Sequence, residues 1–224
     1  SDLSPRSFLF RPLARELTRI KRKLIDARRA AHEEARINLG KLDSPWTGER
    51  LHEFINQMLK DRTIMVVSMG EPYHHIKTGA TISSTIPAGG LVTAIEPIMQ
   101  ACGGTWIAAG GNGDADALVV DTHDRVRVPP SEPKYTLRRV WLPEEDARKN
   151  YEGFCIEGMW ALFHNAHNRP IFRKEDWEAY KKINGKFAEI ILEEVRDLKK
   201  PLIFIQDFQF TLLPLMIKRA RPDA

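Results

Sequence analysis

Cysteine is scarce in this sequence, with only Cys102 and Cys155 among 224 residues and no C-x-x-C pair. This usage excludes a disulfide framework and a cysteine-based zinc site, and it is typical of a reducing compartment. No apolar run approaches the roughly eighteen residues that a membrane-spanning helix needs. The first residues lack the basic, apolar and small-residue order of a signal peptide. We therefore expect a cytoplasmic protein that contacts no membrane and holds no metal.

Charge of one sign is also limited, since 34 basic and 30 acidic residues leave a net charge of +4. The excess lies in residues 1–40, which hold ten Lys and Arg against five Asp and Glu. Apolar residues recur there every three or four positions, which predicts an amphipathic helix over residues 11–39. Its basic face could pack on its own domain, join copies of the chain, or bind an anionic membrane or nucleic acid. We favour packing on its own domain, and the absence of interleaved aromatic residues argues against nucleic acid as a partner.

A second, shorter helix is predicted over residues 44–60, with Thr47 as its N-cap. Its apolar positions fall on one side and comprise Leu51, Phe54, Ile55, Met58 and Leu59. We therefore divide the chain into a helical extension at residues 1–61 and a main domain at residues 62–224. The two helices of the extension are also where we expect any homo-oligomer to form.

Strands and helices alternate after residue 62. The sequence predicts strands at 63–68, 105–109, 117–122, 124–130, 135–142 and 201–208, and helices at 91–102, 144–166, 174–198 and 211–220. Residues 69–90, rich in Gly, Pro and His, are expected to form a loop. This alternation predicts an α/β fold with a Rossmann-like, mostly parallel sheet.

Two glycine pairs enclose the helix predicted at 91–102. Gly89-Gly90 precedes the helix, where exposed backbone N–H groups and the positive end of the helix could approach a phosphate. The same pair could serve only a tight turn, and the pattern by itself favours that interpretation. Gly103-Gly104 follows the helix and is expected to end it.

Four spaced blocks add more than a general pattern: residues 87–106 (PAGGLVTAIEPIMQACGGTW), 151–170 (YEGFCIEGMWALFHNAHNRP), 176–194 (DWEAYKKINGKFAEIILEE) and 201–224 (PLIFIQDFQFTLLPLMIKRARPDA). In this order they resemble the trehalose-6-phosphate synthases, the retaining glycosyltransferases of family 20. The resemblance implies a GT-B architecture, of which this chain is similar to the first, acceptor-side domain, without the C-terminal donor domain. It also implies transfer of glucose from UDP-glucose or another nucleotide-glucose to glucose 6-phosphate or a related acceptor. The chain alone is then expected to be inactive.

Specific residues follow from that resemblance. Gly90, with Gly89 beside it, matches the glycine loop that lies against the donor's sugar and diphosphate. Tyr151 and Trp160 match residues that line the glucose 6-phosphate pocket, and Asp207 matches an aspartate that hydrogen-bonds acceptor hydroxyls, so we assign it the catalytic role. The family chemistry needs no cofactor besides the nucleotide-sugar, because the leaving diphosphate takes the acceptor proton.

Several positions depart from the family pattern. Gly70 stands where the family has an arginine that grips the acceptor phosphate, a role that Lys77, His74 or His75 would have to fill. Three further family positions have changed: Gln206 and Gln209 replace histidines, and Ala109 replaces a tryptophan. The run Glu71-Pro72-Tyr73 resembles glucosylglycerol-phosphate synthases, which leaves the acceptor open.

Those departures keep a second interpretation open, in which the chain is a non-catalytic, sugar-phosphate-binding or regulatory relative that acts through a partner enzyme. A metal at His164 and His167 is not expected, because no third ligand is evident. The run GGNGDAD, with Asp114 and Asp116, is expected to form a turn.

Overall fold

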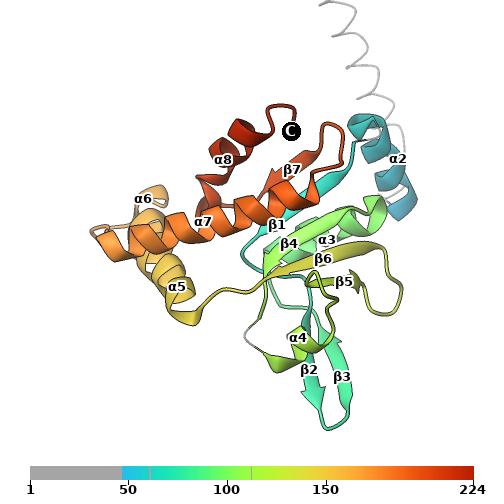
Figure 1. Cartoon of the computed structure of the whole chain (residues 1–224), viewed down its shortest axis with the longest axis horizontal. Coiled ribbons are helices and arrows are strands. Elements are labelled where there is room, and N and C mark those ends of the chain that lie inside the picture. Colours follow the sequence, from blue (N-terminus) through green and yellow to red (C-terminus); the bar gives the residue numbers. More distant parts are fainter. Residues whose placement is uncertain (1–46, 61, 112) are drawn as a thin grey trace, which may run out of the picture. The chain divides into compact units, whose positions relative to one another are not determined.

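The computed structural model describes residues 47–60, 62–111 and 113–224. The helix expected over residues 11–39 lies outside the described residues. Residues Thr47–Ala224 form one compact unit (Figure 1).

A five-stranded sheet forms the centre of this unit, with strand order β5-β6-β4-β1-β7. Four neighbouring strands run parallel: β1 (Ile64–Ser68), β4 (Thr105–Ala109), β6 (Tyr135–Val140) and β7 (Leu202–Ile205). The edge strand β5 (Arg125–Val128) is antiparallel to β6. The predicted α/β fold with a mostly parallel sheet is therefore confirmed.

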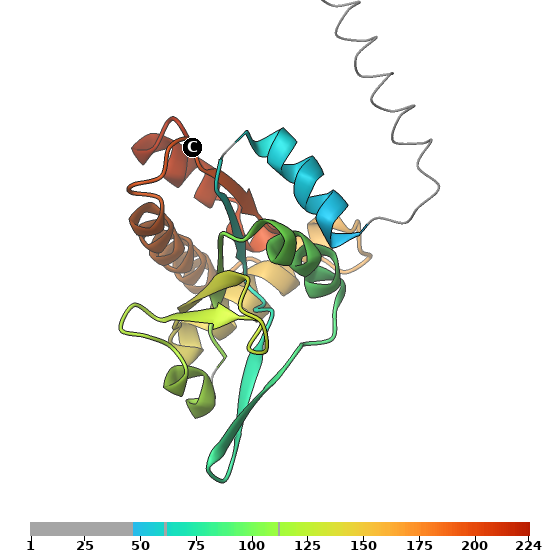
Figure 2. The same ribbon diagram turned by 90° about the vertical axis from the view of Figure 1, so that its right-hand side faces the viewer.

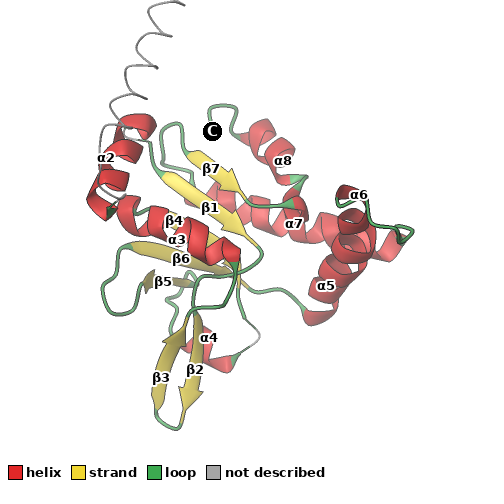
Figure 3. Cartoon of the chain, turned by 180° about the vertical axis from the view of Figure 1, so that it is seen from behind, coloured by secondary structure: helices red, strands yellow, loops and turns green. Residues whose placement is uncertain are grey.

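Helices cover both faces of the sheet (Figures 1 and 3). Alternate residues of β1 point to opposite faces, because side chains alternate along a strand. Val66 packs in the cluster under α3 (Gly90–Cys102), which includes the fully buried Trp106. Met65 and Val67 pack in the other cluster, against α7 (Lys174–Glu194) and α8 (Leu213–Ala220). The apolar run of β1 is thus buried on both sides, as its composition predicts.

A hairpin, β2 (His74–Thr78) and β3 (Thr81–Thr85), occupies much of residues 69–90. The loop prediction was wrong for this segment, because the hairpin has almost no buried side chains and hence no apolar alternation to reveal it. Gly79 has a φ of 63° in the connecting turn. Figure 2 shows the hairpin projecting away from the main sheet.

The strand predicted at 117–122 was also wrong. Residues 114–118 form the short helix α4 (Asp114–Leu118), and the chain then turns toward β5. The apolar run at residues 117–120 is exposed or half-buried, whereas Asp116 just before it is buried and fixes the segment from inside the fold.

The helix predicted at 44–60 is observed as α2 (Gly48–Leu59). Thr47 caps it as expected, since its Oγ1 accepts a hydrogen bond from the Arg50 N–H at 3.3 Å. α2 packs beside α3, within the same compact unit as the sheet. Among the described helices, none joins sufficient length to sufficient apolarity to cross a membrane.

The segment between β6 and α7 is helical, as predicted, and changes its hydrogen-bonding pattern along its length. It begins as α5 (Glu144–Arg148), continues as the π-helix η1 (Lys149–Trp160) and ends as α6 (Ala161–Phe163). A short 3₁₀ turn, η2 (Phe208–Phe210), follows β7 and packs against η1. Twelve residues of π-helix are unusual, and such stretches are frequent at functional sites.

Candidate functional site

The order of the strands locates the candidate site. From β1 the chain moves to β4 and then β6 on one side, and it later returns to β7 on the other side of β1. In open α/β sheets, ligands bind at the carboxyl ends of the strands where the direction of winding reverses. Here that position is the edge where β1 ends near Gly70 and β7 ends near Asp207.

The glycine pair at the start of α3 lies at this edge. A β-carbon on Gly70 would be 3.3 Å from Cδ2 of Leu91, so the end of β1 touches the first turn of α3. Gly89 and Gly90 are exposed, and a β-carbon on either would have no atom within 4 Å. The space beside this helix N-terminus is therefore open to a ligand. Gly103 ends the helix as predicted, with a φ of 71° and its N–H donating to the Met99 carbonyl.

Asp207 follows β7 and is exposed. Its φ of 75° turns the chain, and its Oδ1 accepts a hydrogen bond from the Phe208 N–H at 2.8 Å. Asp207 also acts electrostatically on the buried thiol of Cys155 in η1. Burial raises the pKa of Cys155 to about 12, and the negative charge of Asp207 adds to that rise. The rings of Phe163 and Phe208 are 6.0 Å apart. The fold thus brings Asp207 next to the segment that carries Tyr151 and Trp160.

The π-helix decides how Tyr151 and Trp160 are arranged. In an α-helix of 3.6 residues per turn, nine residues are two and a half turns, so the two side chains would face opposite sides. The wider π-helix has about 4.4 residues per turn, so nine residues are close to two full turns. Both aromatic side chains are exposed, at 44% and 40%, and Trp160 stacks on His164 with ring centroids 4.5 Å apart. The two candidate acceptor residues therefore lie on the same side of η1.

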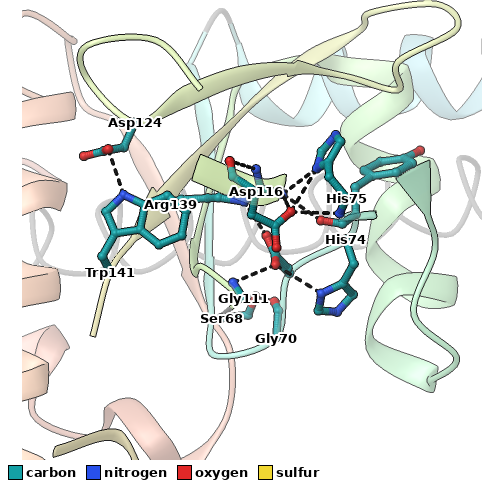
Figure 4. A network of polar contacts seen from close by, with 11 residues as sticks. Ser68, Gly70, His74, His75, Gly111, Asp116, Asp124, Arg139 and Trp141 are labelled. Carbon is teal, nitrogen blue, oxygen red and sulfur yellow. Dashed lines mark hydrogen bonds and ion pairs between the residues drawn. The ribbon is translucent and has the colours of Figure 1, made fainter. Parts of the chain in front are cut away.

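A buried polar network lies farther along the same edge, at the carboxyl ends of β1, β4 and β6. Figure 4 shows its side chains. Its centre is Arg139 of β6, whose side chain has no exposed surface. The Arg139 Nε donates to Oε2 of Glu71 at 2.7 Å, and its Nη2 donates to Oδ1 of Asp116 at 2.8 Å. Further bonds reach the carbonyls of Asp116 and Tyr73. Each of the three guanidinium nitrogens makes a bond inside the protein and the side chain is fully buried, so Arg139 has a structural role here.

Asp116 joins α4 to the start of the hairpin. Its Oδ1 accepts the His75 backbone N–H at 2.8 Å and lies 3.0 Å from His75 Nδ1 (Figure 4). Burial raises the pKa of Glu71, against the opposing effect of Arg139, and burial lowers the pKa of His75. In the described structure, two carboxylates thus face one guanidinium in a space from which most water is excluded.

The positions that depart from the family pattern can now be located. His75 is held inside the network and Lys77 is exposed on the hairpin, while His74 lies 3.3 Å from Glu71 Oε1 with its side chain 45% exposed. His75 therefore points into the protein, and His74 and Lys77 are the two of the three candidates for the arginine's role that reach the surface. Gln209 is buried, and its carbonyl accepts a hydrogen bond from the amide of Asn184 at 3.1 Å.

The Arg139 network leaves little trace in the sequence. Asp116 is expected in a turn, and Arg139 lies in a strand in which every residue but Thr136 is buried, Arg138 among them. An arginine within an otherwise buried strand is a signal that could have been used, because a buried charge requires partners.

Comparison with known proteins places these features in a family context. A family model, Glycosyltransferase family 20, matches residues 62–224. A trehalose-6-phosphate synthase of Mycobacterium ulcerans is 34% identical over 143 residues, which are 64% of this chain and 27% of that protein. A trehalose-6-phosphate synthase of Mycobacterium tuberculosis is 29% identical over 182 residues, which are 80% of this chain and 35% of that protein. The chain spans about a third or less of the length of these relatives.

Solved structures show the same fold. The trehalose-6-phosphate synthase OtsA aligns with a TM-score of 0.52 and 21% identity, over 71% of this chain and 31% of that chain. A structure from E. coli with UDP-2-fluoro glucose bound gives a TM-score of 0.52, and an alpha,alpha-trehalose-phosphate synthase from Burkholderia vietnamiensis gives 0.51. Each of these alignments covers 71% of this chain and 30% of the other.

Proposed function

This chain belongs to glycosyltransferase family 20, and on that premise we propose that it forms the acceptor-side half of a retaining glucosyltransferase. The observation that carries the proposal is the family match over residues 62–224, which includes every strand of both sheets. The proposed reaction moves glucose from a nucleotide-glucose to glucose 6-phosphate or a related sugar phosphate. UDP-glucose is the donor that we propose, since UDP-2-fluoro glucose is the ligand of the E. coli neighbour.

Different residues along the edge of the sheet are suited to the donor and to the acceptor. We propose that the open N-terminus of α3 at Gly89 and Gly90 approaches the donor diphosphate, where backbone N–H groups and the helix dipole favour negative charge. Tyr151 and Trp160, on one side of η1, would pack against the acceptor sugar. Asp207 would accept hydrogen bonds from acceptor hydroxyls. Electrostatic stabilisation of the leaving diphosphate would then be the main contribution to catalysis.

Binding of the acceptor tests this proposal without requiring turnover. Glucose 6-phosphate would be titrated into the full chain by calorimetry, beside Trp160→Ala and Asp207→Asn. The asparagine keeps the shape of Asp207 and its acceptor for the Phe208 N–H but removes the charge. We expect saturable binding by the parent chain and at least tenfold weaker binding by both variants. Asp223→Asn, an exposed aspartate paired with Arg221, is the matched control and should bind as the parent does.

A second function is favoured by one specific observation. Gly70 brings no side chain to the end of β1, and the nearby Arg139 is fully buried and bonded to Glu71 inside the protein. A regulatory relative that binds a sugar without its phosphate fits this arrangement. Glucose would then bind as tightly as glucose 6-phosphate in the same calorimetric titration, whereas a preference of tenfold or more for the phosphate supports the transferase. We expect no glucose transfer by the isolated chain in either case, and product formation by it would contradict that expectation.

A further inference from the structure

Three metal-ligand atoms gather around Gly111, which has no side chain to separate them. A β-carbon built there would lie 2.5 Å from Asp116 Oδ2, 3.1 Å from Glu71 Oε1 and 3.4 Å from His74 Nδ1. The three ligand atoms also lie within 4.8 Å of one another. A β-carbon would collide with Asp116 Oδ2, so the three ligand atoms can gather here only because residue 111 is glycine. Two carboxylates and an imidazole this close together form a ligand set that a metal ion can join.

We propose that Glu71, His74 and Asp116 bind a divalent first-row transition metal ion, with Zn²⁺ as the best fit. Imidazole nitrogen and carboxylate oxygen together suit Zn²⁺ and its neighbours, whereas Mg²⁺ prefers oxygen ligands alone. Ligands at the 2.0–2.2 Å bond lengths of tetrahedral zinc lie about 3.3 Å apart. Glu71 Oε1 and His74 Nδ1 are already 3.3 Å apart.

The two carboxylates are oriented for this role. Glu71 Oε2 accepts from Arg139, and Glu71 Oε1 faces His74 Nδ1 and accepts the Gly111 N–H at 2.9 Å. Asp116 Oδ1 accepts from Arg139 and from the His75 N–H, while its Oδ2 lies beside Gly111 and receives no hydrogen bond from any described residue. The Asp116 side chain as a whole is 3% exposed, and Oδ2 is the oxygen that it has available for an ion. Metal-ligating carboxylates are commonly fixed in this way by a hydrogen bond to the other oxygen.

The net charge of the cluster and the exposure of His74 are also consistent with metal binding. Two carboxylates against the single guanidinium of Arg139 leave one negative charge unbalanced in a buried place, and a cation would offset it. The side chains of Glu71 and Asp116 are almost fully buried, but that of His74 is 45% exposed. An ion can therefore enter from the His74 side. Three protein ligands would leave at least one coordination position open to water or to an anionic oxygen.

The site was not expected from the sequence, where the two cysteines and the unsupported pair His164 and His167 argued against a metal. Glu71 and His74 are three residues apart, and only the fold brings Asp116 of α4 to them. The proposal is independent of the proposed transferase function, because metal binding is measured without any sugar or nucleotide.

Zinc binding by the untagged full chain tests the proposal directly. Competition with a chromophoric zinc chelator, after removal of bound metal, should give one tight site per chain, and zinc should raise the Tm while Mg²⁺ at the same concentration does not. His74→Ala should weaken zinc binding at least tenfold, because it removes a ligand. His74 is partly exposed, so this variant should keep the fold and the Tm of the metal-free chain. His167→Ala, an exposed histidine outside the cluster, is the matched control and should bind zinc unchanged.

Gly111→Ala provides a second test that leaves all three ligand residues unchanged. Its methyl group would collide with Asp116 Oδ2 and displace that ligand atom, so zinc binding should fall as far as in His74→Ala. Equal zinc affinity in the parent chain, His74→Ala and Gly111→Ala would overturn the proposal, as would a parent chain that binds no stoichiometric zinc.

Discussion

Arg139 shows how a single residue can organise a large part of this fold. Its guanidinium joins Glu71 after β1, Asp116 in α4 and the carbonyl of Tyr73 before the hairpin. A buried charge of this kind stabilises only while its partners are present, since desolvation costs each ion several kcal/mol. Removal of the arginine leaves two carboxylates buried together without a cation.

We predict that Arg139→Met lowers the free energy of unfolding by about 3–5 kcal/mol, the usual cost of breaking a buried pair. Urea unfolding followed by circular dichroism measures the change. Arg127→Met on the adjacent strand β5 is the matched control, because Arg127 is exposed and should change stability by less than about 0.5 kcal/mol. Similar losses in both variants would mean that the network contributes little.

The raised pKa of Cys155 predicts how the stability of the chain depends on pH. Burial, with a smaller contribution from Asp207, raises its pKa from 9.0 to about 12 in the folded chain. Folding therefore favours the protonated thiol, so its contribution to stability is complete below pH 9 and is lost as pH rises from 9 toward 12. We expect stability to fall by up to about 1.4 kcal/mol per pH unit in that range. Urea unfolding at pH 8, 9 and 10 measures the slope, which should be smaller in Cys155→Ala.

The same pKa predicts low thiol reactivity. At pH 8 only about one Cys155 in ten thousand would be the reactive thiolate. In a Cys102→Ser chain, where Cys155 is the sole thiol, iodoacetamide should label the native protein very slowly and the urea-unfolded protein fully. Rapid labelling of the native chain would show that η1 opens readily and that the thiol is not kept buried.

At the scale of elements, the ends of α3 are set by its glycines. Gly104 lies between α3 and β4 with a φ of 97°, and a β-carbon there would collide with the carbonyl oxygen of Ile64. The close approach of β1 and β4 at this point thus requires glycine. Gly185, in the middle of α7, has no such requirement, because a β-carbon there would have no atom within 4 Å.

Replacing glycine with alanine should therefore have opposite effects on stability at positions 104 and 185. Gly104→Ala should destabilise the chain by about 2 kcal/mol or more, from backbone strain and the collision with Ile64. Gly185→Ala should stabilise it by about 0.5–1 kcal/mol, because alanine is the better helix former. Thermal and urea unfolding of the two variants give the signs, and a destabilising effect at Gly185 would contradict the packing described for α7.

At the scale of the whole molecule, the boundary of the folding unit can be tested. Residues Thr47–Ala224 form one compact unit, in which α2 packs on α3, whereas the sequence placed the boundary after residue 61. Chains beginning at Thr47 and at Arg62 separate these alternatives. Because Leu51, Ile55 and Leu59 are each partly buried, we expect the shorter chain to be less stable by about 2–3 kcal/mol. Equal stability in urea would support the boundary after residue 61.

The sequence by itself determined the α/β class, the parallel strands and most helices of this protein. Buried parallel strands and long helices leave strong local patterns, so β1, β4, β6, β7 and α7 could be predicted from composition and periodicity. The hairpin at residues 74–85 leaves no such pattern because its side chains are almost all exposed. Asp207 was proposed from the family resemblance, and its place just after β7 is at the carboxyl edge of the sheet, where ligands bind in such folds.

Only the tertiary structure decided which side chains meet. The π-helical turn size sets Tyr151 and Trp160 on one side of η1, and nothing in their nine-residue separation shows that the helix is wider than an α-helix. The meeting of Glu71, His74, Asp116 and Arg139 depends on the order of strands in the sheet and on the absence of a side chain at Gly111. Side chains from segments far apart in sequence converge through packing, and local sequence patterns carry no record of that convergence.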